Sequence, residues 1–171
     1  MKQIIGNLLD QKGVICHQVN MRRIMGAGLA LQIRNKWPEA YEEYRNYCLK
    51  KPELGHVIYS IVSRDVIVAH LFGQSDIGTG IMTNYDVYPA MLESVDRYAS
   101  SINERIYIPY GIGCGIGGGN WKIMLPMIEE YCPEATIVKL DTIPIQCELS
   151  EVERSNRGWI GQTLNTPNRN L

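Results

Sequence analysis

Two glycine-rich segments carry the residue types best suited to hold phosphate groups. Met25–Gly28 and Gly113–Asn120 each follow a β-branched apolar run and precede a segment with helical periodicity. Glycine lets backbone N–H groups turn toward a ligand and phosphate oxygens approach closely, and the next helix adds unpaired N–H donors at its N-terminus. Turn formation needs one or two glycines, whereas residues 113–119 contain five. Two such loops facing each other would suit a diphosphate, although turn formation explains Met25–Gly28 equally well.

The second segment also fits a different class of protein. Gly113, Gly115 and Gly118 match the pattern GxGxxG between a predicted strand and a predicted helix, and Asp141 ends the next predicted strand. This is the dinucleotide-binding fingerprint of a Rossmann domain, in which an acidic residue follows after about twenty positions. Such a domain begins with this unit and needs more strands after it, whereas only residues 142–171 follow Asp141. An NAD-binding Rossmann-type oxidoreductase is therefore the remote alternative.

The segments that must position these loops alternate between strand and helix. Short apolar runs predict strands, and apolar residues spaced i, i+3, i+4, i+7 predict amphipathic helices. We expect strands at residues 3–5, 14–19, 56–62, 66–71, 106–109 and 136–140, and helices at 29–37, 38–51, 88–98 and 121–131. This alternation predicts the α/β fold class.

Composition limits the function classes. A chain of 171 residues, 45% hydrophobic and 20% charged, fits one globular domain. Its net charge of −1 and lack of a basic run argue against a nucleic-acid partner. Five cysteines without CxxC spacing predict reduced thiols and no metal site. Without an apolar run of about 20 residues or a signal-like N-terminus, we expect a cytoplasmic, soluble protein without a membrane partner or a cofactor.

The order of these motifs resembles that of the macro domains. The matching segments are Gly6–Leu9, Ile15–Asn20, Met25–Ala30, Lys36–Pro38 and Ile108–Ile116 with Trp121 after it. The resemblance covers about residues 1–140. It is strongest to the branch that contains terminal ADP-ribose protein glycohydrolase and the ADP-ribose 1″-phosphate phosphatases, the Appr-1-p processing proteins.

The resemblance implies a three-layer α/β/α macro domain over residues 1–141, with a mixed, mostly parallel six-stranded sheet. Residues 142–171 would form an extension that packs on the domain or is partly disordered. The ligand would be a small ADP-ribose-type nucleotide lying across the strand ends. By position, the adenine would contact Gly6, Asn7 and Leu8, one phosphate Gly26, Ala27, Gly28 and Leu29, and the other phosphate and distal ribose Gly113, Cys114, Gly115, Ile116 and Gly117. Asn20 would bind the distal ribose hydroxyls, or serve only as a turn residue after its strand.

Three positions depart from the family pattern. Asn7 stands where an acidic residue usually accepts from the adenine amino group, and a neutral acceptor is weaker. Met82 and Gly117 stand at the positions matched to the glycohydrolase's nucleophilic Lys and its Asp. A thioether and a bare glycine can neither form a Schiff base nor transfer a proton, so we do not expect lysyl-type removal of ADP-ribose.

His17 and Asp86 are the candidate catalytic residues that remain. The phosphatase-like relatives also carry a His where His17 stands. With a near-neutral pKa, His17 could take a proton from water attacking a terminal phosphate, and Asp86 could orient that water. His17 could equally be a buried strand histidine, and Asp86 a helix N-cap. The predicted function is thus ADP-ribose binding with hydrolysis of ADP-ribose 1″-phosphate. The alternative is a non-catalytic protein that reads or sequesters ADP-ribose-like nucleotides.

Overall fold

The computed structural model describes residues 1–141, and the predicted extension over 142–171 lies outside them. Each strand and helix expected from the sequence is present, with bounds that differ by a few residues. The strands are β1 (Lys2–Ile5), β2 (Gly13–Asn20), β3 (Val57–Ser63), β4 (Val66–Gln74), β5 (Ile106–Pro109) and β6 (Thr136–Lys139). The α-helices are α1 (Gly28–Lys36), α2 (Pro38–Cys48), α3 (Tyr88–Ser101) and α4 (Trp121–Tyr131), with short 3-10 helices η1 (Leu8–Asp10) and η2 (Tyr85–Val87).

The strands form one six-stranded sheet in the order β1-β6-β5-β2-β4-β3. All neighbours pair in parallel except β3, which forms an antiparallel hairpin with β4 at one edge. In register, His17 of β2 lies beside His70 of β4, and Val14 lies beside Ile106 of β5. The sheet is therefore mixed and mostly parallel, as the sequence resemblance implied.

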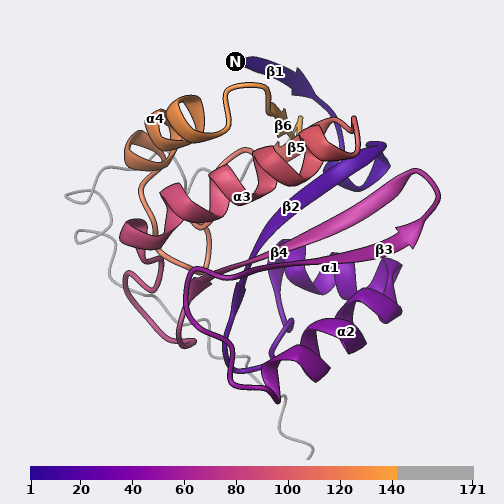
Figure 1. Cartoon of the computed structure of the whole chain (residues 1–171). Helices are drawn as coiled ribbons and strands as arrows, with labels where there is room; N and C mark the ends of the chain where they lie inside the picture. Colours follow the sequence, from indigo (N-terminus) through magenta and orange to yellow (C-terminus); the bar gives the residue numbers. More distant parts are fainter. Residues whose placement is uncertain (142–171) are drawn as a thin grey trace, which may run out of the picture.

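Helices cover both faces of this sheet, with α1 and α2 on one face and α3 and α4 on the other (Figure 1). Side chains alternate along β2, as they must in a strand. Val14 and Cys16 pack in the core beneath α3 and α4, whereas Ile15 and Val19 face α1 and α2. Because β2 is buried on both faces, its sequence is nearly continuous in apolar residues.

Local sequence explains where the helices begin. Pro38 occupies the first turn of α2, where its missing N–H costs nothing, and Pro89 does the same in α3. Asn120 caps α4, with its side-chain oxygen accepting from the Lys122 N–H at 2.9 Å. Within residues 1–141, no helix is both long and apolar enough to span a bilayer.

The chain turns in opposite directions on the two sides of the β2–β5 pair. From β2 it runs through α1 and α2 toward β3, whereas from β5 it runs through α4 to β6 on the other side. In open α/β sheets, ligands bind beyond the carboxyl ends of strands at such a switch point. The segments after β2 and β5 are the two glycine-rich loops, so the topology brings them to one place.

The Rossmann alternative is wrong. Residues 110–120 separate β5 from α4, so the GxGxxG match does not form the tight strand-to-helix turn of a dinucleotide-binding unit. β5 and its successor β6 lie on the β1 side of the sheet, and β6 is the last strand of the described chain. Asp141 lies beyond the end of β6 and is exposed.

Candidate functional site

A cavity of about 560 Å³ lies at the carboxyl ends of β2 and β5. This volume is within the range of small-ligand pockets. Its walls include parts of both glycine loops, and among the described residues no Lys, Arg, Asp or Glu lines it. Any attraction for a phosphate must therefore come from backbone dipoles rather than from side-chain charge. The lining comprises His17, Gln18, Asn20, Ile24, Gly26, Ala27, Gly28, Leu29, Ala30, Gln74, Ile77, Pro109, Tyr110, Gly111, Ile112, Gly113, Gly115, Ile116 and Gly117.

The first loop presents the N-terminus of α1 to this cavity. Met25 is buried against Val19 and Phe72 and anchors the loop in the core. Ala27 occupies the N-cap position and has no side chain that can accept from the helix. The first N–H groups of a helix have no partner within it, so those of Gly28 and its two successors remain available at the cavity wall. Gly28 begins the helix at φ +56, a conformation that glycine adopts without strain.

The second loop turns its carbonyl groups inward. The Gly113 carbonyl accepts from the Gly119 N–H at 2.9 Å and from Thr83 Oγ1 at 2.7 Å. The Gly117 carbonyl accepts from the N–H groups of Met82 and Thr83, at 2.9 and 3.0 Å. The N–H groups of Gly113, Gly115, Ile116 and Gly117 donate to no other residue of the described chain. The loop thus directs a set of unpaired donors away from the protein interior.

A buried hydrogen-bond network supports the second loop from below. Tyr88 of α3 donates to Gln18 Oε1, and burial raises the pKa of Tyr88 well above its usual value, which keeps this donor protonated. Gln18 Nε2 donates to Thr83 Oγ1 at 3.1 Å and to the side chain of Gln74. Sequence analysis missed these residues. The available signal was the polar Gln18 and Gln74 at the carboxyl ends of otherwise apolar strands.

Gly118→Ala should disrupt the second loop. Gly118 has φ +68, and an added Cβ would overlap with the Gly80 carbonyl oxygen. The backbone conformation alone costs a non-glycine residue roughly 1–2 kcal/mol, and the overlap adds to this cost. We expect a lower melting temperature and about tenfold weaker nucleotide binding. Gly115→Ala is the matched control, because its added Cβ meets nothing within 4 Å; equal behaviour of the two variants would contradict the prediction.

The cavity brings together most of the residues predicted for the two phosphates, but not those predicted for adenine. Gly6, Asn7 and Leu8 are outside its lining. They follow β1, three strands from β2 or about 14 Å at the usual strand spacing. Asn7 instead caps η1, with its side-chain oxygen accepting from the Leu9 N–H at 3.0 Å. Cys114 packs in the core beneath α3 and α4, and its N–H donates to Gly111.

Asn20 lines the cavity, but its side chain also holds the first loop in place. Its Nδ2 donates to the Ile24 carbonyl at 2.7 Å, and its Oδ1 accepts from the Arg22 N–H at 2.9 Å. The hydroxyl of Tyr44 donates to the Asn20 carbonyl at 2.6 Å. The predicted contact with a ribose would have to use the second hydrogen of Nδ2, and it stays a prediction.

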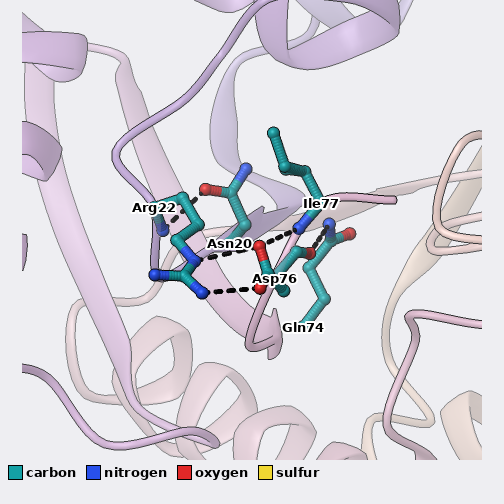
Figure 2. Close-up of polar contacts among 5 residues, drawn as sticks. All are labelled: Asn20, Arg22, Gln74, Asp76 and Ile77. Atoms are coloured by element: carbon teal, nitrogen blue, oxygen red, sulfur yellow. Dashed lines mark hydrogen bonds and ion pairs between the residues drawn. The ribbon is translucent and has the colours of Figure 1, made fainter.

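An ion pair joins the segments that follow β2 and β4 (Figure 2). Arg22 Nε and Nη2 donate to the two carboxylate oxygens of Asp76 at 2.9 and 2.6 Å. Asp76 Oδ1 also accepts from the Ile77 N–H, and its carbonyl accepts from Gln74 Nε2 at 2.8 Å. The hydrogen bonds from Arg22 and Ile77 lower the pKa of Asp76 to about 2. Because Gln74 and Ile77 line the cavity, this pairing sets the position of one wall.

Asp76→Asn should loosen that wall without unfolding the protein. Both partners are about half exposed, and exposed ion pairs contribute little to global stability. We expect faster hydrogen exchange at the Ile77 amide and an almost unchanged melting temperature. Asp65→Asn is the control, since it breaks the exposed Lys12–Asp65 pair at the opposite end of β4. If Ile77 exchanged equally fast in both variants, the pair would have no local role.

His17 is buried on the cavity floor and pairs with a second histidine. Its Nε2 lies 2.7 Å from His70 Nδ1. Burial lowers the pKa of His17 well below its usual value, and the neighbouring His70 lowers it further. The expectation of a near-neutral pKa is therefore wrong, because both rings lie in a low-dielectric interior where the charged form is disfavoured.

Asp86 does not join this site. Its side chain is exposed, and Asp86 is absent from the cavity lining. It is also not the helix cap, because Asn84 caps η2 by accepting from the Asp86 N–H at 3.0 Å. Within residues 1–141, no three His, Cys, Asp or Glu side chains gather as metal ligands would.

Comparison with solved structures identifies the fold. A protein of unknown function from Bacteroides thetaiotaomicron is 28% identical, with a TM-score of 0.75 over 81% of this chain and 96% of that chain. A macrodomain protein from Streptomyces coelicolor is 22% identical, with a TM-score of 0.69 over 83% of this chain and 99% of that chain. This chain has the macro domain fold. No family model matches its sequence.

Two further matches come from Thermosipho africanus. The structure of DarTG in complex with ADP-ribose resembles this macro domain with a TM-score of 0.68 at 19% identity, over 84% of this chain and 43% of that chain. A curated DNA ADP-ribosyl transferase–DNA ADP-ribosyl glycohydrolase fusion protein is 24% identical over 156 residues, or 80% of this chain. This chain spans only 40% of the length of that curated relative.

Proposed function

We propose that this macro domain binds ADP-ribose or a close derivative, with the diphosphate held between the two glycine loops. The observation that carries the proposal is a pair of unpaired N–H sets on the walls of one cavity. One set lies at the start of α1, and the other comprises the N–H groups of Gly113, Gly115, Ile116 and Gly117. A solved macro domain relative, DarTG of T. africanus, holds ADP-ribose.

The electrostatics of the cavity favour a diphosphate over a neutral sugar. The positive end of the α1 dipole faces the cavity, and oriented N–H groups bind phosphate oxygens without a counter-charge. A monophosphate would engage one loop only. We therefore expect selectivity to arise from simultaneous contact with both loops.

Calorimetry with ADP-ribose, AMP and NAD tests this proposal. We expect ADP-ribose to bind at least tenfold more tightly than AMP, because only the diphosphate reaches both loops. Absence of ADP-ribose binding, or tight NAD binding with no preference for ADP-ribose, would overturn it.

The enzymatic form of the proposal is hydrolysis of ADP-ribose 1″-phosphate. The position of His17 on the cavity floor supports it, whereas its lowered pKa makes it a weak base. The curated relative is named for a glycohydrolase. In this chain, however, Met82 and Gly117 stand where the terminal ADP-ribose protein glycohydrolase has its nucleophilic Lys and its Asp. These two residues contact each other through a 2.9 Å backbone hydrogen bond. Phosphate release from ADP-ribose 1″-phosphate separates an enzyme from a reader, and an unchanged rate in His17→Ala would exclude His17 as the base.

A further inference from the structure

Three isoleucine residues at the cavity are exposed to solvent. Ile24, Ile77 and Ile116 line the cavity and are 44%, 48% and 64% exposed. They belong to the segments that follow β2, β4 and β5, respectively. Single exposed apolar residues are common on protein surfaces, whereas a group of them at one ligand cavity indicates a binding surface. We call these three residues the isoleucine collar.

Hydrogen bonds fix the backbone at two members of the collar. Asn20 Nδ2 donates to the Ile24 carbonyl at 2.7 Å, and Asn20 Oδ1 accepts from the Ile24 N–H at 3.3 Å. Asp76 Oδ1 accepts from the Ile77 N–H at 2.7 Å, and the same carboxylate binds Arg22. Figure 2 shows the Ile77 side chain directed away from this ion pair. These two isoleucines therefore cannot turn into the core without breaking the hydrogen bonds of their own backbone.

The collar offers no counter-charge to a charged group. Among the described residues, no Lys, Arg, Asp or Glu lines the cavity. Arg22 and Asp76, which lie close to the collar in the sequence, bind each other through two hydrogen bonds and neutralise each other. A charged group placed against isoleucine side chains would lose hydration without compensation. An uncharged apolar group would instead gain free energy from burial against them.

The sheet order places the collar toward the distal end of the proposed ligand. β1 and β4 lie on opposite sides of the β5–β2 pair. The adenine is predicted beside Gly6–Leu8, which follow β1, and the diphosphate between the loops that follow β2 and β5. A ligand in this position directs its distal ribose toward the end of β4, which Ile77 follows.

We infer that the isoleucine collar binds an uncharged, apolar group attached to the distal ribose of ADP-ribose. The collar thereby selects ADP-ribose derivatives that carry such a group over derivatives in which the attached group ends in a carboxylate. This inference rests on the proposed function for the ADP-ribose part of the ligand. It does not depend on whether the domain hydrolyses that ligand.

Two esters of the distal ribose test this selectivity by calorimetry. O-butyryl-ADP-ribose and O-succinyl-ADP-ribose have acyl chains of equal length, but the succinyl chain ends in a carboxylate. We expect the butyryl ester to bind about fivefold more tightly, because only its chain gains from burial against isoleucine. Equal binding of the two esters, or tighter binding of the succinyl ester, would overturn the inference. Failure of ADP-ribose and both esters to bind would refute the proposed function, and the inference with it.

Variants of the collar separate this selectivity from the binding of the diphosphate, because the ratio of the two dissociation constants cancels effects on the part that the esters share. Ile116→Lys should reverse the ratio by pairing its ammonium with the succinyl carboxylate, and Ile77→Ser should bring the ratio toward one. Ile61→Lys is the matched control, since Ile61 is 69% exposed on the edge strand β3 and lies outside the cavity lining. A wild-type ratio in both collar variants would exclude the collar as the cause of the selectivity.

Methyl NMR of the isoleucine δ1 groups locates the contact. Addition of the butyryl ester should shift the Ile77 and Ile116 signals beyond their positions with ADP-ribose, while the Ile61 signal stays unchanged. If the ester and ADP-ribose gave identical collar signals, the acyl group would not lie against the collar and the inference would be wrong.

Discussion

Gly115→Glu is expected to weaken ADP-ribose binding ten- to a hundredfold while the fold is retained. Gly115 lines the cavity, and its added Cβ would meet nothing within 4 Å. The new carboxylate would lie beside a diphosphate in a cavity wall that offers no described cationic side chain to offset it. Each lost hydrogen bond to a charged group costs about 1.5–3 kcal/mol, which corresponds to the expected change in the dissociation constant. Calorimetry measures it.

Three variants separate charge from shape in that experiment. Gly115→Ala should bind like the wild type, and Gly115→Lys should bind more tightly. Gly78→Glu adds the same charge at an exposed glycine outside the cavity lining and should have little effect. Gly28→Glu is a less suitable probe, because Gly28 has φ +56, and a glutamate in that backbone conformation would strain the loop as well as add charge. An unaltered dissociation constant in Gly115→Glu would remove the second loop from the binding site.

Acidification from pH 7.5 to 5 is expected to destabilise the protein strongly through the buried histidine pair. Burial lowers the pKa of His70 to about 3 from an ordinary value of 6.5, and the pKa of His17 is also lowered. The unfolded chain therefore binds protons below pH 6.5 that the folded protein does not, and stability falls as the pH falls from 6.5 toward 3. For His70 alone the loss at pH 5 is about 2 kcal/mol, and His17 adds to it in the same direction.

Urea unfolding between pH 5 and 8 measures this dependence. Replacing either ring, as in His17→Asn or His70→Asn, should make the slope of stability against pH shallower even where the variant is less stable overall. Asp76 does not contribute in this window, because its lowered pKa matters only below its ordinary value of 3.8. An equally steep slope in both variants would show that the histidine pair does not cause the acid sensitivity.

The sequence was sufficient to predict the strands and α-helices and to identify the two glycine-rich loops between them, because both depend on local patterns. Apolar runs and helical periodicity predicted every strand and every α-helix of residues 1–141, but not the 3-10 helices η1 and η2. The five glycines of residues 113–119 were interpreted as a ligand loop because local turn formation could not account for them. The N–H groups of Gly113, Gly115 and Gly117 do lack partners in the described chain.

Tertiary structure alone decided what the polar side chains do, because their partners are distant in the sequence. Burial lowers the pKa of His17 below the near-neutral value that was expected, and His70, which lies 53 positions away in the sequence, lowers it further. Arg22 and Asp76, 54 positions apart, pair only because β2 and β4 are neighbours in the sheet. Local periodicity reports which residues are buried, but parallel strands joined through helices bring distant residues into contact, and this contact sets protonation and hydrogen bonding at the site.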